Sequence, residues 1–270
     1  MTEFRRETIA YHAGPDADPV RHRLDLFTPA PRANGAVGAA ASFLLYFHGG
    51  VWQRGDKSEY RNIGEAFARR GVVTAIVNYR LTPPARHPDH VRDAARAAAW
   101  AIRHAAAYGA SPDRVFLSGH SAGGHLVTLL LFDPTYLRAE GVEPEGLAGV
   151  IAFSGVFDLR SPIDDTPEGG FDRHIYPPFG RDPEALDAAS PIRQLRSTAV
   201  PVLIVLAADD YRDMQAQSKA FAEALRQRQV HATFETVPRR GHFQLVQAIG
   251  SEGDPTTALV ARFVMGHTET

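Results

Sequence analysis

The chain has 270 residues, of which 44% are hydrophobic and 22% are charged, and its formal net charge at pH 7 is −2. This composition is typical of a globular protein with a large core, and α/β folds often reach this length as one domain. The small net charge gives no basis for binding nucleic acid or an anionic membrane surface. Because the chain has no cysteine, disulfides, thiolate metal sites and a cysteine nucleophile are excluded.

The start of the chain, residues 1–7, is polar, and no apolar run approaches the length of a membrane span. We therefore expect neither a signal peptide nor a membrane-spanning helix, and we expect a soluble, cytoplasmic protein. The sequence leaves the oligomeric state open, a homodimer included.

The predicted elements begin with a strand at residues 21–27, where apolar and polar side chains alternate as in an antiparallel strand with one face in water. From residue 43 onward, short apolar runs alternate with helical patterns. The predicted order is strand 43–47, helix 59–70, strand 72–77, helix 89–108, strand 115–117, helix 126–132, strand 147–153, strand 201–206, helix 213–229, strand 231–237 and helix 256–263. This alternation predicts a single α/β domain over residues 1–270, with a mostly parallel sheet covered on both faces.

Between residues 159 and 191 the periodic patterns disappear, and proline, glycine, aspartate and aromatic residues dominate. Loops of this length are usually functional or disordered, and the aromatic content argues against disorder. We therefore predict that residues 159–191 form a small cap that lines one side of a pocket.

His87 and His90 flank Asp89 at the predicted start of a helix. These residue types can bind metal ions, but no further ligand cluster is placed to complete a coordination shell. We expect a solvated helix start here and no metal site.

The most informative stretch is Gly119-His120-Ser121-Ala122-Gly123. It follows a short apolar strand and precedes an apolar helix, which is the context in which a serine in Gly-x-Ser-x-Gly becomes a nucleophile. The glycines leave room for strand and helix to meet, and the serine stands at the helix N-terminus, where the helix dipole is positive. The pattern therefore predicts that Ser121 is a nucleophile.

A serine nucleophile needs a base, and the base needs an orienting acid. In open α/β sheets such groups gather at the carboxyl ends of the strands. His242 follows the predicted strand 231–237, whereas His231 lies within that strand and His267 lies in the terminal tail. Either Asp209 or Asp210 can supply the acid, and we favour Asp210 because it lies further into its loop. Either aspartate could instead only cap the next helix.

The oxyanion hole of such a site uses the N–H group after the nucleophile and another from the loop after the first buried parallel strand. Ala122 provides the first. Gly49 and Gly50 lie on that loop, directly after the predicted strand 43–47. Alone these glycines would indicate an ordinary turn; with Ser121 they predict an oxyanion loop.

Several motifs together resemble the carboxylesterase and arylformamidase branch of the α/β-hydrolases, over residues 25–263. They are His48-Gly49-Gly50-Val51-Trp52, Asn78-Tyr79-Arg80-Leu81, Gly119-His120-Ser121-Ala122-Gly123-Gly124, Ser154-Gly155-Val156-Phe157-Asp158-Leu159, Asp210 with Gln217-Ser218, and Gly241-His242-Phe243. The similarity is greatest to kynurenine formamidase-like enzymes, in which an aromatic residue usually occupies the position of Val51. The resemblance implies an α/β-hydrolase fold and no metal or organic cofactor.

The sequence thus predicts a serine hydrolase that cleaves small carboxylic esters, with Ser121, Asp210 and His242 as its catalytic residues. An arylformamidase acting on N-formylkynurenine is the alternative enzyme, and a catalytically silent binding module of the same fold is the non-enzyme alternative. Haloalkane dehalogenation would need an aspartate in place of Ser121. The expected partner is a small ester or formamide, with no nucleic acid and no membrane.

The expected pocket walls come from three parts of the chain. They are Val51, Trp52, His120, Phe157, Tyr176 and Phe179. If Trp52, Phe157, Tyr176 or Phe179 is fully buried, we expect it to belong to the core instead.

Overall fold

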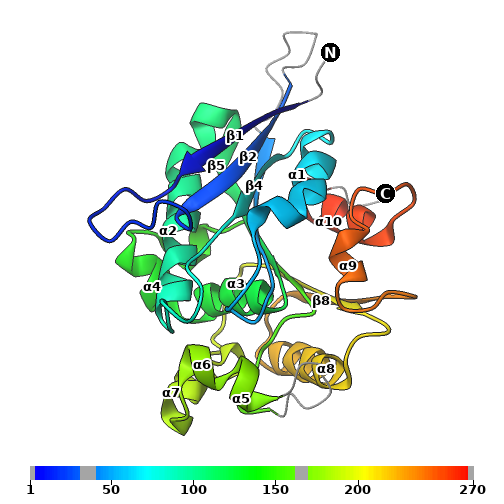
Figure 1. Ribbon diagram of the computed structural model, residues 1–270. Helices are drawn as coiled ribbons and strands as arrows, with labels where there is room; N and C mark the ends of the chain where they lie inside the picture. Colours follow the sequence, from blue (N-terminus) through cyan, green and yellow to red (C-terminus); the bar gives the residue numbers. More distant parts are fainter. Residues whose placement is uncertain (1–3, 31–40, 162–169, 267–270) are drawn as a thin grey trace.

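A computed structural model describes residues 4–30, 41–161 and 170–266, and within them an eight-stranded sheet in the order β1-β2-β4-β3-β5-β6-β7-β8 (Figure 1). The strands are β1 (Phe4–Ala10), β2 (Arg23–Pro29), β3 (Ala41–Phe47), β4 (Val73–Val77), β5 (Ala110–His120), β6 (Gly149–Phe153), β7 (Val202–Ala207) and β8 (Ala232–Val237). All pairings from β4 to β8 are parallel, whereas β1 pairs with β2 and β2 with β4 in the antiparallel sense. The predicted mostly parallel sheet is confirmed.

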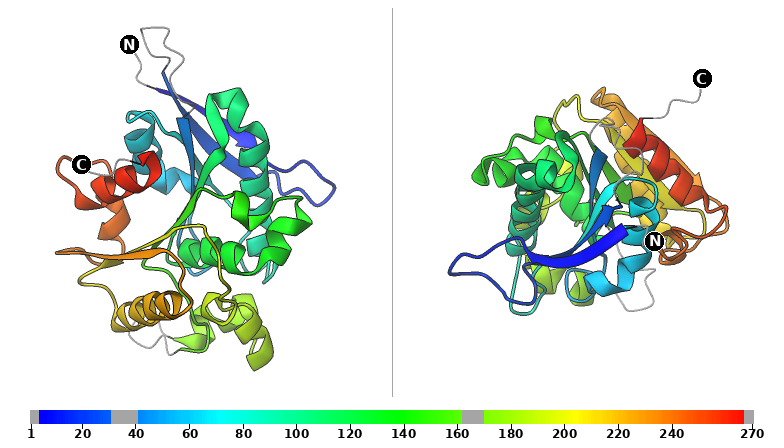
Figure 2. Two further views of the ribbon diagram at one scale, coloured as in Figure 1. Left: turned by 180° about the vertical axis from the view of Figure 1, so that it is seen from behind. Right: turned by 90° about the horizontal axis from the view of Figure 1, so that it is seen from above.

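Helices cover both faces of this sheet, and α2 and α10 lie on opposite sides of the strands (Figure 2). The longer helices are α1 (Arg61–Ala68), α2 (Asp89–His104), α3 (Ala122–Phe132), α8 (Arg212–Gln227) and α10 (Pro255–Met265). One hydrophobic core lies between the sheet and α2, α3 and α8, and a second lies between the sheet and α1, α9 (Gln244–Gln247) and α10. No helix in the described ranges is long and apolar enough to span a membrane.

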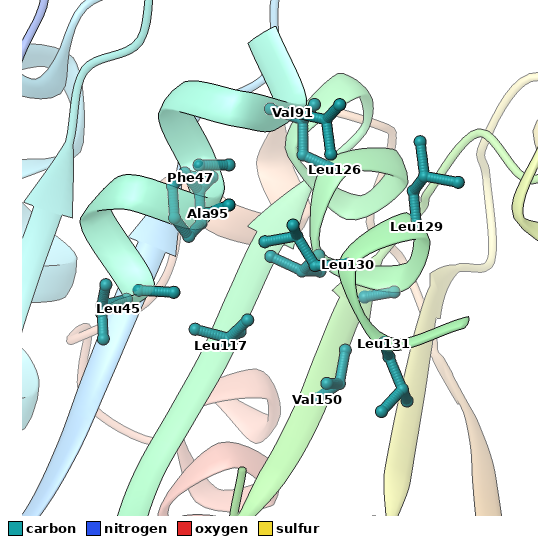
Figure 3. Packing of buried hydrophobic residues seen from close by; sticks show 14 of the residues in the cluster. Leu45, Phe47, Val91, Ala95, Leu117, Leu126, Leu129, Leu130, Leu131 and Val150 are labelled. Atoms are coloured by element: carbon teal, nitrogen blue, oxygen red, sulfur yellow. The ribbon is translucent and has the colours of Figure 1, made fainter. Parts of the chain in front are cut away.

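Helix α3 lies at the centre of the first core. All of its residues are buried, as expected for a helix that is apolar around its whole circumference. Its leucines pack between α2 and strands β3, β5 and β6 (Figure 3). This packing fixes the start of α3, and therefore Ser121, against the end of β5.

Strand β2 was predicted to have one solvent-exposed face, but both of its faces are buried over residues 24–27. Asp25, in the middle of the strand, is as buried as its apolar neighbours. Its carboxylate accepts hydrogen bonds from Arg6, Thr8 and Lys57 at 2.7–2.8 Å. A buried charge is stable when it is paired in this way, so alternation of polar and apolar residues did not mean alternation of exposure here.

The predicted cap contains three short helices, α5 (Phe171–His174), α6 (Tyr176–Phe179) and α7 (Pro183–Ala188), with residues 162–169 outside the described part. They gather at one end of the molecule, below α3 in the view of Figure 1. Hydrogen bonds anchor the cap to the rest of the chain. Among them, the His87 N–H donates to the carbonyl of Pro178 at 2.8 Å, and Gln53 Nε2 donates to the carbonyl of Arg173 at 2.6 Å.

The expected solvated helix start at residues 87–90 is wrong for His90, which is only 1% exposed. Its ring lies edge-on to that of Tyr79, and its Nε2 lies 3.2 Å from Thr82 Oγ1. The side chain of His90, in the first turn of α2, is therefore packed in the protein interior.

Candidate active site

Ser121 lies between the end of β5 and the start of α3, in a strained backbone conformation with φ 54° and ψ −115°. Residues without glycine's freedom avoid positive φ, and such strain is concentrated at functional sites. The turn also needs its glycines: a Cβ on Gly119 would lie 2.3 Å from the backbone of Gly123, and one on Gly123 would lie 2.0 Å from the carbonyl oxygen of Phe47. The geometry is the strand-turn-helix elbow expected from the sequence.

Asp210 and His242 come from the loops after β7 and β8 and meet in a buried hydrogen bond of 2.8 Å between Asp210 Oδ1 and His242 Nδ1. A carboxylate only accepts hydrogen bonds, so His242 carries its proton on Nδ1 and leaves the Nε2 lone pair available. The same Oδ1 accepts from the Tyr211 N–H, and Gln215 Nε2 donates to the Asp210 carbonyl, both at 2.8 Å. These contacts hold the Asp210 carboxylate in place.

The other candidates named from the sequence are placed differently. Asp209 is exposed, and its N–H bonds the carbonyl of Arg240. His231 lies just before β8 and is exposed, and His267 is outside the described residues. The geometry thus brings Asp210 to His242 and leaves Asp209 in solvent.

The loop after β3 lies directly against the elbow. A Cβ on Gly49 would stand 3.2 Å from Ser121 Cβ and 2.9 Å from His120 Nδ1. The next three residues, Gly50, Val51 and Trp52, all have positive φ, of 114°, 50° and 58°. For a β-branched residue such as Val51 this is a strained conformation, which the loop maintains through hydrogen bonds from the N–H groups of residues 53 and 54 to the Gly50 carbonyl.

The motif residues His48 and Tyr79 support this loop. The Tyr79 hydroxyl donates to the His48 carbonyl at 2.9 Å, and the two rings stack at 4.5 Å. His48 Nδ1 in turn lies 2.7 Å from the Gly49 carbonyl. Because a carbonyl oxygen only accepts hydrogen bonds, the ring proton lies on Nδ1 and donates to it. Burial lowers the pKa of His48 to about 4, so the ring is a neutral donor at pH 7.

Neighbouring motif residues also act as supports. Asn78 accepts a hydrogen bond from the Lys57 N–H and donates to Asp56, and these bonds close the far end of the loop after β3. Arg80 donates to the buried Asp93 through Nε and Nη2, both at 2.8 Å. Asp93 had no motif of its own, and its role as the acceptor on α2 was not anticipated from the sequence.

Gln217 on α8 holds the loop after β6. Its Oε1 accepts hydrogen bonds from the N–H groups of Phe157 and Asp158 at 2.9 and 3.0 Å. The resemblance had marked these positions without assigning them a task. Their contacts show a buried brace between a helix and a loop of the site.

The expected pocket walls separate into two groups. Phe157 is fully buried and stacks on Phe221 at 4.1 Å, and Trp52 is 1% exposed and lies edge-on to His125 and Phe179. By the criterion set above, Trp52 and Phe157 belong to the core. Phe179 is 9% exposed, packs in the same hydrophobic core and joins the cap to Trp52.

His120 is also fully buried and so does not form a pocket wall as expected. Val51 and Tyr176 remain partly exposed. A hollow beside the loop after β3 has Val51 in its lining, together with Gln53, Arg54, Arg173, His174 and Pro177. Within the described ranges, no three His, Asp or Glu side chains are grouped as metal ligands would be.

Comparison with known proteins supports the resemblance. Residues 24–225 match the family BD-FAE. The chain belongs to the BD-FAE family. This family match and the fold confirm the α/β-hydrolase relationship inferred from the motifs.

Among curated relatives, a probable isoprenylcysteine alpha-carbonyl methylesterase of Oryza sativa subsp. japonica is 28% identical over 220 residues, covering 77% of this chain and 51% of the relative. The kynurenine formamidase of Danio rerio is 24% identical over 247 residues, covering 90% of this chain and 78% of the relative. The chain thus spans about half the length of the plant methylesterases that it matches.

Two solved structures share the α/β-hydrolase fold of this BD-FAE family member. Esterase B from Lactobacillus rhamnosis superposes with a TM-score of 0.81 at 21% identity, covering 98% of this chain and 86% of that protein. Thermogutta terrifontis esterase 2 in its apo form gives a TM-score of 0.76 at 25% identity, covering 97% and 94%.

Proposed function

We propose that the protein is a serine hydrolase that cleaves small carboxylic esters, with short acyl chains or aryl leaving groups, through Ser121, His242 and Asp210. The observation that carries this proposal is the hydrogen bond between His242 Nδ1 and Asp210 Oδ1, beside an elbow that holds Ser121 in strained geometry. Family membership and the esterases among the relatives and structural neighbours support the same conclusion.

In the proposed reaction, Ser121 Oγ attacks the ester carbonyl carbon while His242 Nε2 accepts the hydroxyl proton. Asp210 stabilises the resulting imidazolium and keeps its orientation. The tetrahedral intermediate collapses when the bond to the leaving oxygen breaks and that oxygen takes the proton from His242. Water then attacks the acyl-enzyme with His242 again as base, and the acid is released with Ser121 regenerated.

The oxyanion of the intermediate needs donors near Ser121. Ala122 is the first residue of α3, so its N–H has no acceptor within the helix and lies at the positive end of the helix dipole. Gly49 and Gly50 supply the other N–H groups in this proposal, which the close approach of Gly49 to Ser121 supports: a Cβ on Gly49 would lie 3.2 Å from the Cβ of Ser121. Donors fixed in advance are usually the largest single contribution to such catalysis.

Labelling and kinetics test this function together. The wild-type protein should hydrolyse p-nitrophenyl acetate and gain the mass of one organophosphonate group on Ser121, and Ser121→Ala should lose both properties while keeping its melting temperature. A wild-type protein that neither hydrolyses esters nor reacts with the phosphonate would identify a silent binding module. Unchanged ester hydrolysis by Ser121→Ala would refute the proposed nucleophile.

An arylformamidase is the second candidate, because the Danio rerio kynurenine formamidase is matched over 78% of its length, against about half for the plant methylesterases. The same triad could cleave the C–N bond of a formanilide. Specificity constants for N-formylkynurenine, aryl acetates and p-nitrophenyl esters of increasing chain length decide between the two. A formamide that outpaces every ester establishes the formamidase, whereas a steady increase toward long acyl chains contradicts both candidates.

A further inference from the structure

His120 occupies the last position of β5, directly before Ser121, and none of its surface is exposed. A side chain so enclosed offers no surface to a substrate. Its position next to the nucleophile nevertheless gives it contacts with two other parts of the site. These contacts are specific, and the reaction outlined above does not use them.

The first contact is with the loop that carries the base. His120 Nε2 lies 3.0 Å from the backbone carbonyl oxygen of His242, although the two residues are 122 positions apart. The rings of His120 and His242 also pack against each other, with centroids 4.4 Å apart and planes inclined by 47°. A single side chain from β5 thus holds both the backbone and the imidazole of His242.

The second contact is with the oxyanion loop. His120 Nδ1 is the nearest atom to the position that a Cβ on Gly49 would occupy, at 2.9 Å. His120 therefore fills the space where the nucleophile elbow, the oxyanion loop and the loop of His242 meet. A shift of this ring would be transmitted to both loops.

We infer that His120 is a positioning residue, which fixes the His242 loop through its Nε2–H and so aims the imidazole of His242 at Ser121. This inference rests on the proposed function and specifies which residue keeps its base aligned. Alignment of this kind matters because a displacement of about 1 Å at a reacting group can reduce the rate by about 10²-fold.

The protonation state of His120 suits this task. A carbonyl only accepts hydrogen bonds, so the ring proton resides on Nε2. Burial, and next the nearby His242, lower the pKa of His120 well below the usual value. His120 consequently remains neutral at pH 7. A neutral donor can lie against His242 when His242 becomes an imidazolium, whereas a second positive charge there would oppose the proton transfer.

The groups that face His120 are consistent with this role. From the loop after β8 they are His242, itself bonded to Asp210, and the ring of Phe243 at 6.0 Å. From the oxyanion loop it is Gly49, which has no side chain. His242 is thus the titratable group in direct contact with His120 among these neighbours.

Two substitutions separate the hydrogen bond from the packing. His120→Phe keeps a ring of similar shape without a donor, and His120→Gln provides an amide N–H that can occupy the place of Nε2–H. We expect His120→Phe to lower kcat for p-nitrophenyl acetate by about 10- to 100-fold with little change in KM. We expect His120→Gln to recover most of that loss. His231→Phe, the same change at an exposed histidine at the amino end of β8, should leave kcat unchanged.

A kcat in His120→Phe close to that of the wild type, or an equal loss in His120→Gln, would overturn the inference. The NMR signal of the His242 Nδ1–H proton gives a readout that does not need activity: it should shift or broaden in His120→Phe and persist in His120→Gln. If the wild-type protein lacks esterase and formamidase activity, the proposed function fails, and this signal alone decides whether His120 positions His242. An unchanged His242 Nδ1–H signal in His120→Phe would then refute the inference that His120 positions His242.

Discussion

Gly49 and Ser121, 72 positions apart in the chain, approach so closely that a Cβ on Gly49 would lie 3.2 Å from the Cβ of Ser121. Real Cβ contacts of this length are rare, so one of the two backbones would have to move to admit a methyl group. The contact arises because β3 and β5 are adjacent parallel strands that end at the same edge of the sheet. It brings the backbone of the proposed oxyanion loop to the proposed nucleophile.

Gly49→Ala should therefore lower kcat for p-nitrophenyl acetate by about 10²- to 10³-fold, the usual effect of losing an oxyanion donor. The added methyl group displaces the loop from Ser121, or Ser121 from the loop. Gly146→Ala is the matched control, because a Cβ there meets nothing within 4 Å, and it should leave kcat unchanged. Normal turnover by Gly49→Ala would show that this loop takes no part in stabilising the oxyanion.

Much of this arrangement was predictable from the sequence, because it follows from local patterns. Continuous apolar runs identified the buried parallel strands, and the chain order of Ser121, Asp210 and His242 placed all three after strands whose ends share one edge. What could not be predicted was which polar side chains would be buried. Asp25 and His90 look solvent-exposed in the sequence, but distant partners such as Lys57 and Tyr79 enclose them.

Burial by residues distant in sequence also explains why some of the predicted pocket walls were wrong. His120, Trp52 and Phe157 are near the elbow in sequence or in space, and an aromatic ring near a reactive serine suggests a wall. Whether a ring faces a cavity or the core depends on packing by other elements, here Phe221 against Phe157 and the cap residue Phe179 against Trp52. These contacts leave no periodic signal in the sequence.

The choice between the two neighbouring aspartates gives a second prediction. Asp210→Asn should lower kcat by about 10⁴-fold, because an amide at this position favours the wrong tautomer of His242. Asp209→Asn should change kcat little, since Asp209 is exposed and uses only its backbone in the contact with Arg240. Steady-state kinetics on one aryl ester suffices for the comparison. A larger loss in Asp209→Asn would mean that the acid is the other aspartate.

The brace formed by Gln217 gives a prediction about stability. Gln217→Ala would leave the buried N–H group of Phe157 and the partly buried N–H group of Asp158 without their acceptor. Because an unsatisfied buried donor costs about 1–3 kcal/mol, the free energy of unfolding should fall by about 2–4 kcal/mol. Gln227→Ala, in the same helix and exposed, should change it by less than about 0.5 kcal/mol. Urea unfolding measures both, and equal effects would mean that the brace contributes nothing.

Five buried or largely buried histidines contribute to the pH dependence of stability. Burial lowers the pKa of His48, His87 and His90 to about 4, that of His125 to about 3, and that of His120 well below its usual value. In the unfolded chain a histidine has a pKa of about 6.5. Between pH 6.5 and pH 4 the unfolded state therefore binds more protons than the folded state, so these residues stabilise the fold fully above pH 6.5 and lose that contribution as the pH falls toward 4.

The free energy of unfolding should consequently fall steeply from pH 6.5 to pH 4.5, with each such histidine contributing at most about 1.4 kcal/mol per pH unit. His125→Gln should reduce the slope of the free energy of unfolding against pH by the amount that corresponds to about one bound proton. Gln is uncharged and can still donate to the carbonyl of Ala189, which His125 Nε2 contacts at 2.8 Å. His231→Gln, at an exposed site, should leave the steepness as it is. Urea unfolding at half-unit pH intervals gives the proton uptake directly. A free energy that is flat over this range would show that these histidines are protonated in the folded protein, contrary to the effect of their burial.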